Sequence, residues 1–259
     1  MNLTRKDQLD LQHAKNILEN PSFLATVMNA IGLPIEKGIE MLPEDWQQAI
    51  TVTTRKSLQQ ALSVSLASLD YQAASPSWDL MHKAMVAVTG AVGGAFGLPG
   101  LAVELPISTC VMLRSVADIA RSHGERLDTV DARFACIEVF ALGGRSTSDD
   151  GVESAYFAIR SALAKAVSDA AAYFTEKGVI QEGIPVLIRL VNEIAVRFEI
   201  NVSEKLAAQA VPVVGAAGGA IVNTLFIDHF QDMAHGHFTV RRLERMYSPE
   251  FIRSEYNKL

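Results

Sequence analysis

Apolar residues recur at intervals of three to four positions along most of the chain, as they do on one face of an α-helix. The stretch from residue 152 to 177 is typical, because Tyr156, Ile159, Leu163 and Ala166 share one face. No segment has a convincing strand pattern. The pattern therefore predicts an all-α fold. Helices are expected at residues 4–20, 44–69, 128–142, 152–177 and 185–199.

Capping residues and helix breakers define the limits of these helices. Thr4, with Asp7 three residues later, resembles a capping box, and Pro43 stands at the start of the second helix. Asp128 or Thr129 opens the third helix, and the pair Gly143-Gly144 ends it. No period of about 20 to 50 residues recurs, so we expect a single multi-helix domain. It covers residues 1–259, with N-terminal helices at 1–40 and a C-terminal tail at 248–259 on its periphery.

Charged residues are absent from two long windows. Residues 84–103, which end before Glu104, and residues 206–227, which follow Lys205, contain no Asp, Glu, Lys or Arg. Each window is about as long as the roughly 20-residue helix that crosses a bilayer. Only 20% of all residues are charged, against about 25% in an average protein. These two windows account for much of that difference.

Both windows contain the string Gly-Ala-x-Gly-Gly-Ala, at residues 90–95 and 215–220. Glycines four positions apart lie on one side of a helix and allow another backbone to approach closely. Glycine also costs about 1 kcal/mol relative to alanine inside a helix, so we expect contact to compensate. The windows therefore predict two glycine-rich apolar helical hairpins, the first bent at Pro99-Gly100, whose glycine faces pack on each other. The glycines concerned are Gly90, Gly93, Gly94, Gly97, Gly215, Gly218 and Gly219.

Three interpretations of these windows are open. Their residues are mostly Ala, Gly and Val, which insert into membranes weakly compared with Leu and Phe. This composition favours a tightly packed soluble core, and a re-entrant or membrane-inserting hairpin is the second interpretation. The third is a glycine-rich loop that binds phosphate. It is disfavoured because the sequence holds neither a dinucleotide-binding fingerprint nor a P-loop motif.

A polar cluster follows the second window directly. Asp228, Asp232 and His235 share one helical face, and His229 precedes Asp232 by three positions. Such carboxylates and imidazoles can converge on a divalent metal ion, especially if Glu104 faces them, so these five residues form a candidate metal site. Alternatively, the cluster caps a helix and pairs with arginines, while Glu104 meets an arginine, a histidine or a hydroxyl group. The arginines considered are Arg114, Arg121, Arg241, Arg242 and Arg245.

Composition argues against several classes of protein. A net charge of -6, with no basic cluster before the C-terminus, argues against a nucleic-acid partner. Cys110 and Cys136 fit neither a disulfide framework nor a zinc site, so we expect buried thiols in a reducing compartment. The polar residues 1–15 do not resemble a secretory signal. These features predict a cytoplasmic protein or one at the cytoplasmic face of a membrane.

Several strings are similar to those of one protein family. They are Val-Pro-Val-Val-Gly-Ala-Ala-Gly-Gly-Ala at 211–220, Asn-Thr-Leu-Phe-Ile-Asp-His-Phe-Gln-Asp at 223–232, Gly-His-Phe-Thr-Val-Arg-Arg-Leu-Glu-Arg at 236–245, and Ala-Leu-Gly-Gly at 141–144. With these strings, the chain resembles the EcsC family from about residue 25 to 247. The resemblance implies a bacterial protein, cytoplasmic or peripheral to the inner membrane, and accessory to transport. It implies no catalytic residues.

The leading hypothesis is a non-enzymatic helical protein that acts at the inner membrane through its paired hairpins. Its partner is then membrane lipid or a membrane transport protein. The first alternative is a metal-dependent hydrolase that uses Glu104, Asp228, His229, Asp232 and His235 around one or two divalent metal ions. The second alternative is a carrier of lipid or another hydrophobic ligand, with the glycines leaving room for an acyl chain.

Overall fold

The computed structural model describes residues 2–19, 23, 26–27, 46–68, 98–144, 154–177, 183–210 and 215–259. Within these ranges the chain is helical and contains no strand, which confirms the all-α prediction. The helices are α1 (Arg5–Glu19), α4 (Trp46–Ser68), α6 (Leu98–Ser122), α7 (Val130–Glu138), the 3₁₀-helix η1 (Val139–Ala141), α8 (Ala155–Lys177), α9 (Pro185–Ala210), α10 (Gly215–Met246) and α11 (Pro249–Lys258).

The capping residues act as the sequence predicts. The backbone N–H of Asp7 donates to the Thr4 hydroxyl at 3.1 Å, and this hydroxyl donates to the Asp7 carboxylate at 2.6 Å. Thr129 caps α7 by accepting a hydrogen bond from the backbone of Ala132 at 3.4 Å. Gly143 ends the segment after η1 with a φ of 83°, a conformation that favours glycine. Local signals therefore place these helix ends.

The end of α9 differs from the prediction. This helix begins at Pro185 as expected but continues to Ala210 instead of stopping near residue 199. Its last turns keep a buried apolar face, with Val202 and Leu206 almost inaccessible to solvent, and no proline or glycine interrupts them. The uncharged window at 206–227 therefore contributes the end of one helix and the start of the next.

The start of α6 bears on the predicted hairpin. Pro99 and Gly100 stand in the first turn of this helix, where a proline costs no backbone hydrogen bond. They mark the beginning of a continuous helix to Ser122. The arm that would precede them, including the glycine string at 90–97, lies outside the described residues. The paired glycine hairpins therefore stay a prediction.

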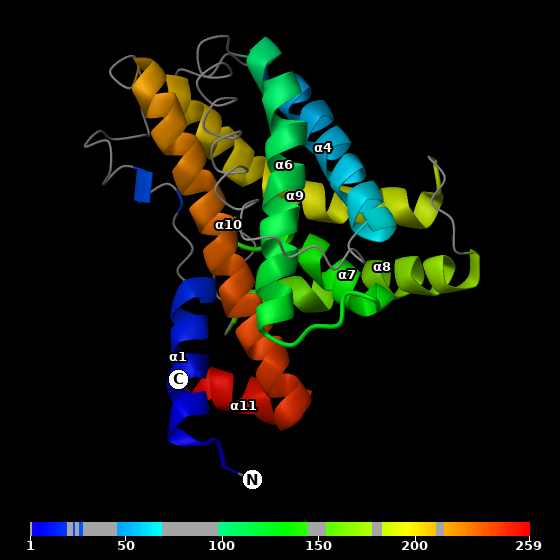
Figure 1. Cartoon of the computed structure of the whole chain (residues 1–259), viewed down its shortest axis with the longest axis vertical. Helices are drawn as coiled ribbons and strands as arrows, with labels where there is room; N and C mark the ends of the chain where they lie inside the picture. The colour runs from blue at the N-terminus through cyan, green and yellow to red at the C-terminus, as the bar shows by residue number, and fades with distance from the viewer. Residues whose placement is uncertain are drawn as a thin grey trace.

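The long helices surround an aromatic core. Helix α4 packs against α6 and α9, α8 packs against α9, and α10 packs against α6 (Figure 1). Between them, Phe140, Phe198, Phe226 and Phe230 form a contiguous group whose neighbouring ring centroids are 5.2 to 5.4 Å apart. Rings at this separation and tilt contribute specific packing as well as buried area. This group connects η1, α9 and α10.

Helices α1 and α11 pack together near the two termini (Figure 1). Tyr256 of α11 is buried, and its hydroxyl donates to the Glu19 carboxylate at the end of α1 at 3.0 Å. Gly236 of α10 lets α1 approach closely, because a Cβ atom at this position would lie 2.8 Å from Cγ of Leu18. The N- and C-terminal helices thus form one end of the described structure.

Candidate functional site

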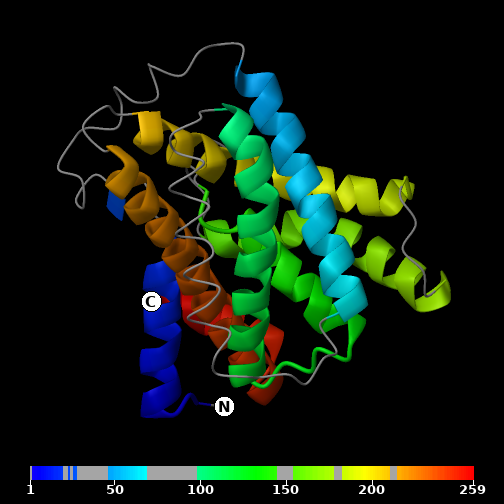
Figure 2. The same ribbon diagram turned by 45° about the horizontal axis from the view of Figure 1, so that its top comes forward.

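The opposite end of the structure brings together the start or end of four helices. Figures 1 and 2 both show the beginnings of α4, α6 and α10 and the end of α9 directed toward this side, away from α1 and α11. The Thr51 hydroxyl of α4 donates to Glu199 of α9 at 3.1 Å, which joins two of these helices. We call the group formed by residues 46–54, 98–113, 199–210 and 215–227 the apolar end.

The apolar end contains very few charged side chains. Residues 46–54 of α4 and 215–227 of α10 include no Asp, Glu, Lys or Arg, and Glu104 is the one such residue in 98–113 of α6. The last part of α9 contributes Glu199, Glu204 and Lys205. Burial raises the pKa of Glu204 to about 7, which favours its uncharged form. Apart from one glutamate–lysine pair, Glu199 and Glu204 are therefore the charged side chains of this end.

Glu104 and Lys205 neutralise each other inside the protein. The Lys205 ammonium donates to both oxygens of Glu104, at 2.9 and 2.8 Å, and the two side chains are 0% and 5% exposed. Nζ of Lys205 also lies 4.8 Å from the centroid of the Phe226 ring. A lysine was not among the groups expected to meet Glu104. The two charges that border the uncharged windows in the sequence are thus partners across α6 and α9.

Large aliphatic side chains are exposed at the same end. Val52 of α4, Val103 of α6 and Ile221 of α10 are 60%, 66% and 48% exposed, and each stands in the first two turns of its helix. In the described part of the chain, one segment, Gly100–Ser122, is long and apolar enough to cross a membrane, but 56% of its apolar window is buried. By itself this composition equally suits the core helix of a soluble protein.

The residues of the candidate metal site do not converge. Glu104 is bound to Lys205, whereas Nδ1 of the exposed His235 lies 3.4 Å from Nε2 of His123. Asp228 and Asp232 are exposed on α10, and His229 is buried on another side of that helix. Among the described residues, no three His, Cys, Asp or Glu side chains could hold a metal ion together. In this structure Glu104 belongs to a separate ion pair, and a metal centre built from these five residues stays a prediction.

Titration of the cluster reflects these different surroundings. Burial lowers the pKa of His229 to about 4, so this imidazole is neutral at physiological pH. Partial burial and the neighbouring Asp228 raise the pKa of Asp232. In the described ranges, neither Asp228 nor Asp232 forms an ion pair with an arginine. The arginines of α10 bind carboxylates of other elements, with Arg241 on Glu125 and Asp131, Arg242 on Asp7 and Asp10, and Arg245 on Glu125.

Both cysteines are free thiols. Cys136 is buried as expected, whereas Cys110 is partly exposed. Burial raises the pKa of both thiols, which disfavours the nucleophilic thiolate.

A family model described as the EcsC protein family matches residues 10–243. The chain belongs to the EcsC family. The match runs from α1 to the last turns of α10, so the apolar end and the Glu104–Lys205 pair lie inside it. No curated protein and no solved structure matches the chain.

Another feature of this EcsC protein was missed by sequence analysis. Asn201 of α9 is fully buried, and neither its side-chain oxygen nor its nitrogen has a hydrogen-bond partner in the described part of the chain. It lies beside Gly144, where a Cβ atom would be 3.2 Å from its Nδ2 and 2.8 Å from the Arg197 carbonyl oxygen. The Gly143-Gly144 pair in the sequence was the signal for this close approach, but it gave no indication of which helix would approach.

Proposed function

We propose that this EcsC protein is a peripheral membrane protein whose apolar end enters the interfacial region of a lipid bilayer. The observation that carries the proposal is the pairing of Glu104 with Lys205. In this ion pair the two opposite charges at the centre of the apolar end offset each other. Charged groups resist transfer toward hydrocarbon, so their mutual neutralisation permits the surrounding helices to approach lipid.

The dimensions of the apolar end suit contact with one leaflet. The uncharged residues 215–227 of α10 extend for about 20 Å, and residues 46–54 of α4 for about 14 Å, at 1.5 Å per residue. Both are shorter than the hydrocarbon core of about 30 Å that a spanning helix must cross. Arg55 and Asp228 are the first charged residues after these two segments, and Arg114 is the next charged residue of α6 after Glu104. These three residues mark the expected boundary with water.

Glycines at the start of α10 fit this arrangement. Gly215, Gly218 and Gly219 stand in its first two turns, and Gly219 is buried. Small residues let helices pack closely where lipid provides no hydrophobic drive for association. We propose that these glycines hold the apolar end together in contact with lipid.

The location follows from this function. We propose that the protein resides in the cytoplasm at the inner face of the membrane, where its two cysteines stay reduced. A membrane transport protein is the alternative partner for the same surface. Vesicles made of lipid alone distinguish the two partners. The protein binds to them if its partner is lipid, and does not bind if it requires a membrane transport protein.

Flotation with liposomes tests the proposal. We expect the protein to float with vesicles of phosphatidylethanolamine and phosphatidylglycerol. Val103→Asp and Ile221→Asp should each reduce partitioning about tenfold, since a carboxylate is costly near hydrocarbon. The quantity measured is the bound fraction at several lipid concentrations.

Val196→Asp provides the matched control. Val196 is a valine of α9 that is 64% exposed, as Val103 is on α6, but it lies 14 positions before the end of its helix. Its replacement should leave flotation unchanged. The proposal is wrong if the unmodified protein stays with the aqueous fraction, or if all three substitutions reduce binding equally.

A further inference from the structure

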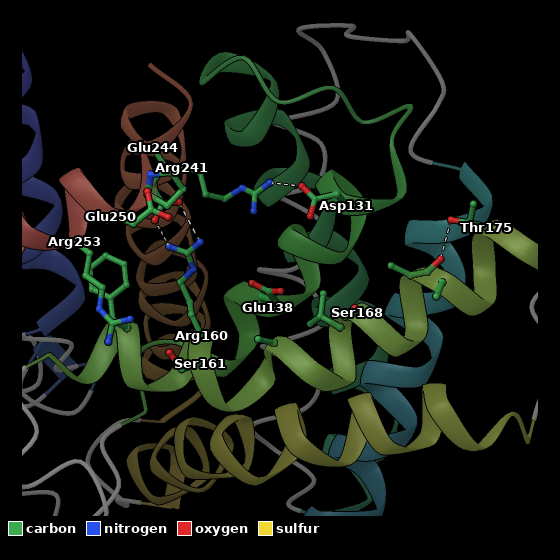
Figure 3. Close-up of a pocket in the computed structure, with 16 residues that line it drawn as sticks. Asp131, Glu138, Arg160, Ser161, Ser168, Thr175, Arg241, Glu244, Glu250 and Arg253 are labelled. Atoms are coloured by element: carbon green, nitrogen blue, oxygen red, sulfur yellow. Dashed lines mark hydrogen bonds and ion pairs between the residues drawn. The ribbon is translucent and has the colours of Figure 1, made fainter. Parts of the chain in front are cut away.

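A pocket lies away from the apolar end, between α7, α8, α10 and α11 (Figure 3). Its volume is about 740 Å³, which is within the range of small-molecule sites. Along α8 its wall runs from Phe157 to Thr175, about 27 Å of helix at 1.5 Å per residue. The pocket is therefore long enough for an extended ligand.

The wall formed by α8 consists mainly of small or apolar side chains. Ala164, Val167, Ala171 and Ala172 face the pocket between Phe157 and Thr175. Such a surface contacts methylene groups without requiring hydrogen bonds from them. Ser161 and Ser168 add two hydroxyl groups along the same wall.

The charged residues of the pocket are mostly paired already. Arg160 donates to both oxygens of Glu244, at 2.8 and 3.1 Å. Arg241 donates to Glu125 at 2.9 Å and to Asp131 at 2.6 Å. Because each of these two guanidinium groups is neutralised by a carboxylate, neither is available to attract an anionic ligand. The third arginine, Arg253, is exposed and lies 5.4 Å from the centroid of the Phe157 ring.

Glu138 is different from these paired residues. It is the last residue of α7, and its carboxylate points into the pocket opposite α8 (Figure 3). It forms no hydrogen bond or ion pair with any described residue, although it is largely enclosed. Desolvation raises its pKa to about 7. An enclosed carboxyl group without a partner is costly unless a ligand supplies one.

We propose that this pocket binds a linear aliphatic amine, with the ammonium group on the Glu138 carboxylate and the methylene chain along α8. With Glu138 ionised, four carboxylates and three arginines line the pocket. The surplus charge is negative, so a cation is favoured over an anion. The Ser161 and Ser168 hydroxyls can accept hydrogen bonds from further amine groups on a longer ligand.

Binding must depend on pH if Glu138 holds the ammonium group. The ligand requires the ionised carboxylate, whereas its own amine stays protonated up to about pH 10. Affinity should therefore be highest above pH 7 and fall by up to about tenfold per unit below it. The other charged groups around Glu138 are Asp131 on α7, Arg160 on α8, and Arg241 and Glu244 on α10, and Glu250 and Arg253 of α11 also line the pocket. The two central arginines stay ionised in this range.

Calorimetric titration of the full chain with hexylamine and with spermidine tests the proposal. Hexanol serves as the uncharged probe. We expect both amines to bind at pH 8 and hexanol to bind at least about tenfold more weakly, because it lacks the charge-assisted hydrogen bond. Glu138→Gln should reduce amine affinity by about tenfold or more, whereas Glu176→Gln, at an exposed carboxylate of α8 outside the pocket lining, should change it less than about twofold.

A second variant keeps the test valid if Glu138→Gln does not fold. Ala164 is exposed on the α8 wall, so Ala164→Leu narrows the pocket without disturbing the core, and it should also weaken amine binding. The proposal is overturned if neither amine binds at millimolar concentration, or if hexanol binds as tightly as hexylamine. Unchanged amine affinity in folded Glu138→Gln or in Ala164→Leu would overturn it as well.

Discussion

Replacement of Lys205 by methionine is expected to lower the free energy of unfolding by about 3 to 5 kcal/mol, because it leaves the Glu104 carboxylate buried without its counterion. The loss comes from two hydrogen bonds at 2.8 and 2.9 Å and from the desolvated charge that remains. Glu104→Leu should have a comparable effect, since it leaves the Lys205 ammonium unpaired. Unfolding by urea, followed by circular dichroism, measures both changes.

The double variant Glu104→Leu/Lys205→Met tests whether the stability losses of the two single variants come from breaking the same ion pair. Buried ion pairs are often replaced by apolar residues of similar volume at little cost, because desolvation of the two charges is then avoided. We expect the double variant to be within about 1 kcal/mol of the unmodified protein. If its loss equals the sum of the two single losses, the side chains are not coupled and the pairing described here is wrong.

Gly143→Ala is expected to have the second largest effect, a loss of about 2 to 5 kcal/mol. Part of the loss, about 1 to 2 kcal/mol, comes from placing a Cβ atom at a φ of 83°. The remainder, about 1 to 3 kcal/mol, comes from a steric clash in a packed core. The added Cβ would lie 2.3 Å from Nε2 of His229 and 3.1 Å from Cγ of Met233. The His229 ring cannot move freely because it packs against Phe23 and Phe230.

Gly183→Ala is the matched control for this clash. Gly183 has a φ of 89°, but a Cβ atom there would meet nothing within 4 Å. Its replacement should cost only the backbone term of about 1 to 2 kcal/mol. Thermal or urea unfolding measures the loss of unfolding free energy in each variant. The difference between the two losses is the cost of the clash between the added Cβ atom at residue 143 and His229. Equal losses would show that this contact does not restrict the turn.

Local signals in the sequence predict much of the fold because they act over a few residues. The Thr4 and Thr129 caps and the glycine turn at Gly143 are as expected, since each depends on neighbours within one helical turn. Helix α9 continues beyond the predicted end near residue 199, because residues 200–210 contain no proline or glycine and keep a buried apolar face.

Long-range partners were harder to predict. Glu104 and Lys205 are 101 residues apart, and no local pattern indicates that α6 and α9 align at these positions. The long-range partners of the polar cluster of α10 are equally hard to predict from local spacing. Helical spacing predicts one face for Asp228 and Asp232, and both are exposed in the structure, but it cannot show that the partner of Glu104 is a lysine of α9. The pocket at Glu138 combines four helices and has no continuous motif.

Quenching of Trp46 fluorescence by lipids brominated in their acyl chains tests the central claim most directly. Trp46 is the first residue of α4, at the apolar end. In the Trp78→Phe variant it is the sole tryptophan, so its emission reports on this end alone. A control variant lacks both native tryptophans and has Phe251→Trp in α11, at the opposite end of the structure. If the apolar end enters the bilayer, brominated vesicles will quench Trp46 strongly and leave the α11 reporter unchanged. Equal quenching of the two reporters, or quenching of neither, would contradict this account.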